Sequence, residues 1–282
     1  MTGSVSWKPR ARRGAVLGAA CALLLGAPPA RAWDVNALVL EAAARQREGE
    51  LNAGRVTLER IEVETELDAA GGRKKPEKRR YSVVMDGRGV VGRELLEVDG
   101  RQATEEEREK SRREDEKRKR ASLEANGARS DEEELMSGRI PLLDLLPRLE
   151  FRLVGEELLD GRPTHVVAFG PKPGLVSKTI RDRVLNNFAG TTWIDVAEQQ
   201  VRKIDGHLTV PVKLLGGVLL DLKGVRLVYE SREVLPGAWA PCREEIDVTA
   251  VAGLFLGYRR EIRFEFSNYR SAQPDVPLRA AR

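Results

Sequence analysis

Residues 190–195, GTTWID, and residues 200–206, QVRKIDG, decide how this chain folds. Apolar, β-branched and aromatic residues in these segments predict strands at 192–196 and 201–210. Only four residues separate the two strands, and strands joined by so short a connection pair side by side. We therefore expect an antiparallel pair at this point.

Strands are expected on both sides of this pair. The cleanest is 258–267, where Ile262, Phe264 and Phe266 alternate with charged residues. Asp160-Gly161, Lys223-Gly224 and Pro236-Gly237 are short turn signals, which favour an antiparallel meander. The remaining strands are expected at 55–67, 81–86, 90–98, 151–159, 163–169, 212–222, 225–234 and 246–251.

The expected sheet has about ten or eleven strands, and a twisted open sheet of more than ~10 strands curls. Apolar residues at three- and four-residue spacings predict a helix over 34–52, and two shorter helices are expected at 141–148 and 176–188. The fold class is therefore α+β and mainly antiparallel β. We expect a strongly curved, open half-barrel whose concave face is lidded by helices.

Residues 1–32 have the pattern of a secretory signal. A basic stretch reaches Arg13, a 13-residue apolar run covers 15–27, and Ala30-Arg31-Ala32 resembles a cleavage site. The run is shorter than the ~20 residues that span a membrane, which favours cleavage over anchoring. Arg12-Arg13 leaves twin-arginine export open, and a lipid anchor at Cys21 is disfavoured because Gly18 stands where leucine is preferred.

Charge and cysteine content narrow the function further. Without the leader, residues 33–282 hold 43 basic and 44 acidic residues, so the basic character of the whole chain belongs to the leader. This balance argues against nucleic-acid binding. Cys242 is then the single cysteine, so no disulfide can form within the chain and stability must come from packing.

The segment from Thr104 to Arg120 is unusual because 15 of its 17 residues are charged. Thr104 and Glu107 fit a capping box, and oppositely charged pairs four residues apart predict a solvent-exposed helix. We interpret residues 102–126 as a charged insertion. It is either a docking arm for an envelope protein partner or a solvated surface feature.

Two apolar stretches bear on ligand binding. Residues 210–222 are apolar with little alternation, which indicates a strand region covered on both faces. Helix packing and an open apolar pocket both explain this pattern. Residues 253–257, GLFLG, form a second patch, which fits transient membrane contact, partner contact or a buried hairpin end.

Catalytic and metal-binding motifs are absent from the sequence. It has no nucleophile elbow, zinc-protease helix, paired-cysteine motif or phosphate-binding loop. His165 and His207 fall singly in expected strands, where structural roles are commonest. Gly87, Gly89 and Gly92 match a dinucleotide fingerprint, but no helix follows. We expect no enzyme activity, cofactor or metal.

The GTTWID and QVRKIDG segments resemble the LolA/LolB-like superfamily of periplasmic, outer-membrane lipoprotein-sorting proteins. The resemblance extends from about Phe151 to Tyr269 and more loosely to the first helix and strands. It implies a periplasmic, bent and incomplete antiparallel barrel whose concave apolar face accepts acyl chains. Trp193 and Asp195 carry over only as parts of the fold motif, and no residue here matches the family's functional arginine.

These observations predict one domain over 33–270 with a loose tail at 271–282. The function they favour is a non-enzymatic periplasmic carrier for lipoprotein acyl chains or other apolar, lipid-like ligands. The alternative is an envelope structural or signalling module with a filled barrel that docks a protein partner through its charged helix. Candidate ligand-lining residues are Val63, Leu214, Leu219, Leu227, Phe264 and Phe266.

Overall fold

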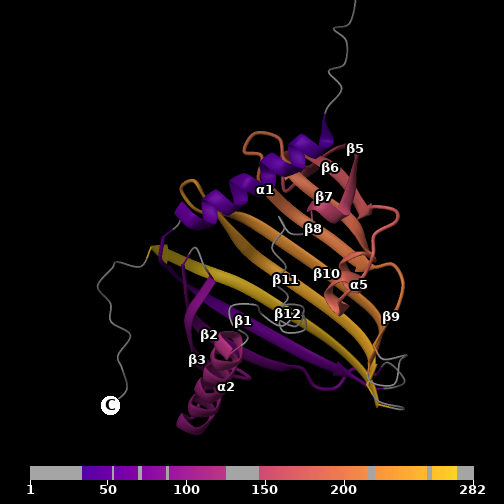
Figure 1. Cartoon of the computed structure of the whole chain (residues 1–282). Coiled ribbons are helices and arrows are strands. Elements are labelled where there is room, and N and C mark those ends of the chain that lie inside the picture. The colour runs from indigo at the N-terminus through magenta and orange to yellow at the C-terminus, as the bar shows by residue number, and fades with distance from the viewer. Residues whose placement is uncertain are drawn as a thin grey trace, which may run out of the picture. The chain divides into compact units, whose positions relative to one another are not determined.

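The alternating residues at 258–267 form part of a long strand, β12 (Leu256–Ser271), in the middle of one large antiparallel sheet. Figure 1 shows this sheet in a computed structural model. The structure describes residues 34–52, 54–68, 72–86, 89–124, 146–214, 220–252 and 256–271.

The described ranges contribute twelve strands to the sheet, which is open. Its order is β4-β3-β2-β1-β12-β11-β10-β8-β7-β6-β5, with β9 paired to β10, and every pairing is antiparallel. Within the described residues the end strands β4 and β5 do not pair, which confirms an open sheet rather than a closed barrel. The other strands are β1 (Val56–Leu67), β2 (Glu77–Asp86), β3 (Gly89–Val98), β4 (Arg101–Gln102), β5 (Leu149–Leu159), β6 (Arg162–Pro171), β7 (Phe188–Asp195), β8 (Val201–Leu208), β9 (Val212–Leu214), β10 (Leu220–Leu235) and β11 (Ala238–Ala252).

Helix α1 (Val35–Asn52) lies across several strands (Figure 1). The Asp34 carboxylate accepts hydrogen bonds from the backbone N–H groups of Asn36 and Ala37, which fixes the start of the helix. The helix contacts β5, β8 and β11. Its 18 residues span about 27 Å. This length matches the five strand spacings, about 24 Å, between β11 and β5.

The helix expected at 176–188 is much shorter in the structure. Helix α5 covers only Ile180–Leu185, because Thr179 and Asp182 form a capping box that begins the helix there. The backbone N–H of Asn186 bonds back to the Asp182 carbonyl, and Phe188 already begins β7. The other helical elements in the described part of the chain are α2 (Glu105–Glu124) and the 3-10 turn η1 (Leu146–Arg148).

The turn expected at Lys223-Gly224 is also absent. β10 runs continuously from Leu220 to Leu235, and its register with β11 shifts between Leu222 and Gly224. The two residues therefore form an irregularity inside one strand, as a β-bulge does, because the neighbouring strand continues past them. The strand expected at 212–222 is correspondingly divided between β9 and β10.

All described residues belong to one compact unit, Asp34–Arg282. The signal peptide expected at 1–32, including Cys21, lies outside the described residues, as do residues 272–282 of the expected tail. Among the helices that the structure describes, none is long and apolar enough to cross a membrane.

Candidate functional site

The two faces of the sheet differ, and the strand register shows which side chains share the face covered by α1. Opposite residues in an antiparallel pair point to the same face, and consecutive residues alternate. Ile204 packs against the cluster beneath α1. Ile204 pairs directly with Tyr229, and Tyr229 pairs with Glu244. Glu244 in turn pairs with Phe264, so all four side chains lie on the same face. We call this the α1 face and the other the opposite face.

Two buried clusters lie on the α1 face, toward the two ends of the strand order. The α1 cluster forms where the helix packs on β5 to β8, and the β1–β3 cluster forms where α2 begins. The members of the α1 cluster are Leu38, Val39, Ala42, Ala43, Leu146, Val167, Ile194 and Val201. The members of the β1–β3 cluster are Leu58, Tyr81, Val83, Leu95, Ala103 and Phe266.

Between these clusters, strands β10, β11 and β12 present an apolar band on the α1 face. Ile246 pairs with Leu227 on one side and with Ile262 on the other, so the three side chains stand in a row. All band residues are half-buried rather than buried. The apolar band consists of Val225, Leu227, Ile246, Val248, Ile262 and Phe264.

Two paired glycines, which have no side chains, lie on the α1 face next to the apolar band. Gly190 and Gly206 pair directly, and a Cβ on Gly190 would lie 2.2 Å from the Asp205 carbonyl oxygen. A Cβ on Gly206 would lie 2.4 Å from the Phe188 ring. The Phe188 and Phe169 rings stack at 6.1 Å between centroids above this pair. The glycines of the GTTWID and QVRKIDG segments therefore make room for two aromatic rings.

Arginine side chains bound the band on its β1–β3 side. The Arg60 guanidinium lies 5.3 Å from the Phe264 ring centroid and 5.0 Å from the Tyr81 ring centroid. The Arg93 guanidinium lies 4.8 Å from the same Tyr81 ring centroid. Arg60 pairs with Glu62 at 3.3 Å, and burial lowers the pKa of Arg60. The apolar surface thus ends at a buried cationic group.

Helix α2 is tied to this arginine group by charge. Arg93 donates to both carboxylate oxygens of Asp115 at 2.8 Å, and its side chain is only 10% exposed. Burial by itself lowers the pKa of Arg93, but the hydrogen bond and charge of Asp115 outweigh it, so the pKa is raised. The pair holds the middle of α2 to β3.

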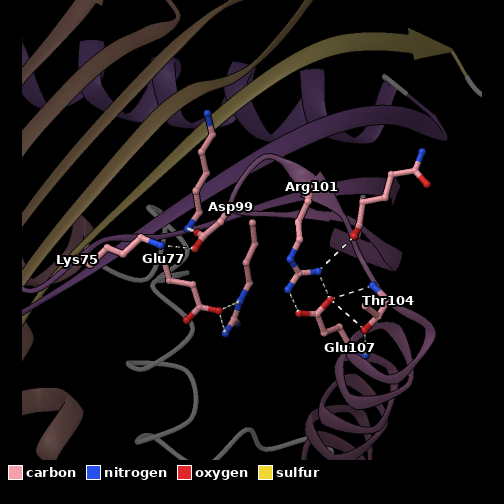
Figure 2. A network of polar contacts seen from close by, with 9 residues as sticks. Lys75, Glu77, Asp99, Arg101, Thr104 and Glu107 are labelled. Atoms are coloured by element: carbon pink, nitrogen blue, oxygen red, sulfur yellow. Dashed lines mark hydrogen bonds and ion pairs between the residues drawn. The ribbon is translucent and has the colours of Figure 1, made fainter.

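A second network fixes the start of α2, as Figure 2 shows. Arg101 donates to both carboxylate oxygens of Glu107, at 2.6 and 2.8 Å. Glu107 also accepts from the backbone N–H of Thr104 at 2.8 Å, which confirms the expected capping box. Next to it, Asp99 accepts from Lys75 and from the Lys78 backbone.

The candidate lining residues are divided by the structure. Leu227 and Phe264 belong to the apolar band, and Phe266 lies on the same face but is buried in the β1–β3 cluster. Val63 pairs with Arg263 and Lys78, so it lies on the opposite face and does not join them. The backbone of Leu214 ends β9, and Leu219 lies outside the described residues.

Trp193 and Asp195 have structural roles. Trp193 lies on the opposite face, with the Lys203 ammonium 5.1 Å from its ring. Asp195 is 1% exposed and binds Arg162 through both oxygens. Burial raises the pKa of Asp195, but hydrogen bonds from Arg162 and from the Ala197 and Glu198 backbone prevail and lower it. These contacts close the β7–β8 turn.

The two histidines lie apart from each other, in β6 and β8. Among the described residues, no group of three or more His, Cys, Asp or Glu residues could hold a metal ion. His165 is buried with its Nδ1 3.0 Å from a Glu156 oxygen, and His207 is exposed in β8.

Most of the band was missed by sequence reasoning. Val225, Ile246, Val248 and Ile262 lie in strands that were expected, but their common face depends on the pairing of β10, β11 and β12. Alternation along 258–267 was the available signal for β12. No local sequence pattern predicted that Arg60 would lie between Tyr81 and Phe264.

Comparisons with solved structures give three distant likenesses. A DUF1329 family protein from Desulfovibrio piger is 14% identical, with TM-score 0.36, over 86% of this chain and 94% of that one. A domain from Vibrio parahaemolyticus, provisionally assigned as an outer membrane lipoprotein-sorting protein, is 12% identical, with TM-score 0.34, over 85% of this chain and 94% of that one. A LolA superfamily protein from Nitrosomonas europaea is 10% identical, with TM-score 0.31, over 85% and 94%.

No protein-family profile matches the chain, and no curated protein matches it. The resemblance to lipoprotein-sorting and LolA superfamily proteins thus appears in structure comparison at low identity. Likenesses this distant carry no function across. The side chains of the α1 face are therefore the basis for a function.

Proposed function

We propose that this protein is a non-enzymatic binding or carrier protein for acyl chains, either of lipoproteins or of other lipid-like ligands. The observation that carries the proposal is the apolar band, six half-buried side chains on three adjacent strands, between two clusters that are already packed. Burying a ligand against such a surface yields about 0.8 kcal/mol per CH₂ group.

The neighbouring features support an elongated apolar ligand. The Phe169 and Phe188 rings, which pack over Gly190 and Gly206, extend the apolar surface of the same face beside the band. Arg60 bounds the band at the other side. The leader expected at 1–32 supports a periplasmic location, where acylated proteins and lipids are available as ligands.

Two measurements test this proposal. Mass spectrometry of organic extracts of the gently purified protein is expected to find stoichiometric acylated molecules. Uptake of a fluorescent fatty acid is expected to fall about tenfold or more in Leu227→Asp and Phe264→Asp, because each puts a charge into the band.

Val63→Asp is the matched control, because Val63 is also half-buried in a strand of the same sheet but lies on the opposite face. It is expected to retain uptake. Circular dichroism and thermal melting must first show that all three variants are folded. Equal uptake by folded Phe264→Asp and the parent protein, or an empty protein that takes up no fatty acid, contradicts the proposal.

A second candidate function is an envelope module that docks a protein partner through α2. The favouring observation is that α2 is fixed by Arg93–Asp115 and by its cap, while most of its described side chains remain exposed. Deleting residues 104–126 tests it. Loss of a co-purifying partner with retained fatty-acid uptake supports docking, and retention of both contradicts it.

A further inference from the structure

The β6–β7 connection, which contains α5, and the segment that follows β8 form one rim of the sheet, and apolar side chains are exposed there. We define the α5 rim as residues 172–187, between β6 and β7, and residues 209–213, which lead into and form most of β9 (Figure 1). Val176 is 75% exposed, Val210 is 48% exposed and Leu175 is 36% exposed. Exposed aliphatic side chains that lie together on neighbouring loops are typical of an interaction surface.

Hydrogen bonds hold the two segments of the rim together. Within residues 172–187, the Asn186 side chain donates to the Ser177 hydroxyl at 3.0 Å. The next carbonyl, of Asn187, accepts from the Thr209 backbone at 2.7 Å and from its hydroxyl at 2.9 Å. Val176 and Val210 each adjoin one of these bonded residues, so they belong to the same edge of the molecule.

The α5 rim is mainly basic. Residues 172–187 and 209–213 include five basic residues and one acidic residue. That acidic residue, Asp182, is paired with Arg148 at 2.6 Å. Lys172, Lys178 and Lys213 are exposed. Among the described residues no ion pair joins these three lysines to a carboxylate. Aliphatic side chains beside such lysines match the two layers of an anionic bilayer surface, acyl chains below and phosphate groups above.

Leu158 shows that exposure alone does not make such a surface. It is 71% exposed, as much as Val176, but it stands in β5 beside Glu156 and Glu157. Acidic neighbours are repelled by anionic lipid. Leu158 therefore provides a matched control within the same chain.

We propose that the α5 rim docks on the surface of a bilayer that contains anionic phospholipid, with Leu175, Val176 and Val210 entering the headgroup–acyl boundary. Lysine stems reach along the apolar surface while their ammonium groups meet the phosphates. The inference goes beyond the proposed function, because ligand binding in the band does not require it.

Sedimentation with vesicles tests the proposal in the purified protein. Binding is expected to vesicles of phosphatidylethanolamine and phosphatidylglycerol, and to weaken with salt and in vesicles of phosphatidylcholine alone. Val176→Asp is expected to weaken binding about tenfold and Lys178→Ala about fivefold. Leu158→Asp is expected to bind like the parent protein.

The outcomes separate this proposal from the previous one. All variants are also assayed for uptake of a fluorescent fatty acid from solution, which Val176→Asp is expected to retain. Absence of vesicle binding by the parent protein, or equal losses in Val176→Asp and Leu158→Asp, overturns the docking proposal even where uptake is intact. Binding that is insensitive to salt and to Lys178→Ala overturns the role of the lysines.

Discussion

Helices α1 and α2 contact the same face of one sheet, yet they are held by different forces. α1 buries Leu38, Val39, Ala42 and Ala43 against β5 to β8. α2 is mostly charged. Its described attachments are the Arg93–Asp115 and Arg101–Glu107 pairs, the cap at Thr104 and packing against β3. Apolar burial is cooperative with the core, whereas an ion pair and a cap can be broken locally. We therefore expect the two helices to respond differently to substitution.

The largest effect is expected in α1. Leu38→Ala is expected to lower the free energy of unfolding by about 2–4 kcal/mol, because it leaves a cavity in the α1 cluster. Leu40→Ala is the control, since Leu40 is 53% exposed on the same helix, and about 0.5 kcal/mol or less is expected. Urea denaturation measures both, and similar losses in the two variants would mean that α1 does not depend on its buried face.

This contrast also explains what could be predicted from the sequence. The helix expected at 34–52 is confirmed as α1, because its apolar spacing is local information. The charged helix after Thr104 is confirmed for the same reason, through its capping box. The helix expected at 176–188 was too long because the Thr179–Asp182 cap, a competing local signal, begins it later.

Features that depend on pairing were harder to predict. Lys223-Gly224 has the composition of a turn, but the continuing partner strand β11 keeps both residues inside β10. Val63 was grouped with Phe264 as a lining residue, yet the register places Phe264 opposite Glu62, the residue beside Val63. A shift of one residue exchanges the two faces of a strand, and no local pattern fixes that choice.

The second largest effect is expected at the ion pair of α2. Asp115→Ala leaves the Arg93 guanidinium without its carboxylate at a site where its side chain is 10% exposed. We expect a cost of about 1–3 kcal/mol, limited by release of α2 into water. Hydrogen exchange is expected to rise in α2 but not in α1. Glu114→Ala, at an exposed neighbour, is the control, and unchanged exchange in Asp115→Ala would show that the pair does not hold the helix.

A smaller effect is expected at the cap. Thr104→Ala removes the hydroxyl that accepts from the Glu107 backbone, which costs the helix about 1 kcal/mol. Faster exchange is expected in the first turn of α2, with little change in the unfolding midpoint of the whole protein. Thr104→Ser keeps the hydroxyl and is expected to restore protection. Equal exchange in the alanine and serine variants would contradict the role of the cap.

The smallest effect is expected from acid. Hydrogen bonds from Arg101 and then from the Thr104 backbone lower the pKa of Glu107 from 4.5 to about 2. Because the folded pKa is the lower one, this contribution is complete above pH 4.5 and is lost as the pH falls through about 2. In an NMR titration the Thr104 amide is expected to shift with a midpoint near pH 2, and Glu107→Gln is expected to abolish that shift. A midpoint near 4.5 in the parent protein would mean that Arg101 does not hold Glu107 in solution, so that the Thr104 hydroxyl, the Arg93–Asp115 pair and the packing against β3 hold α2 without it.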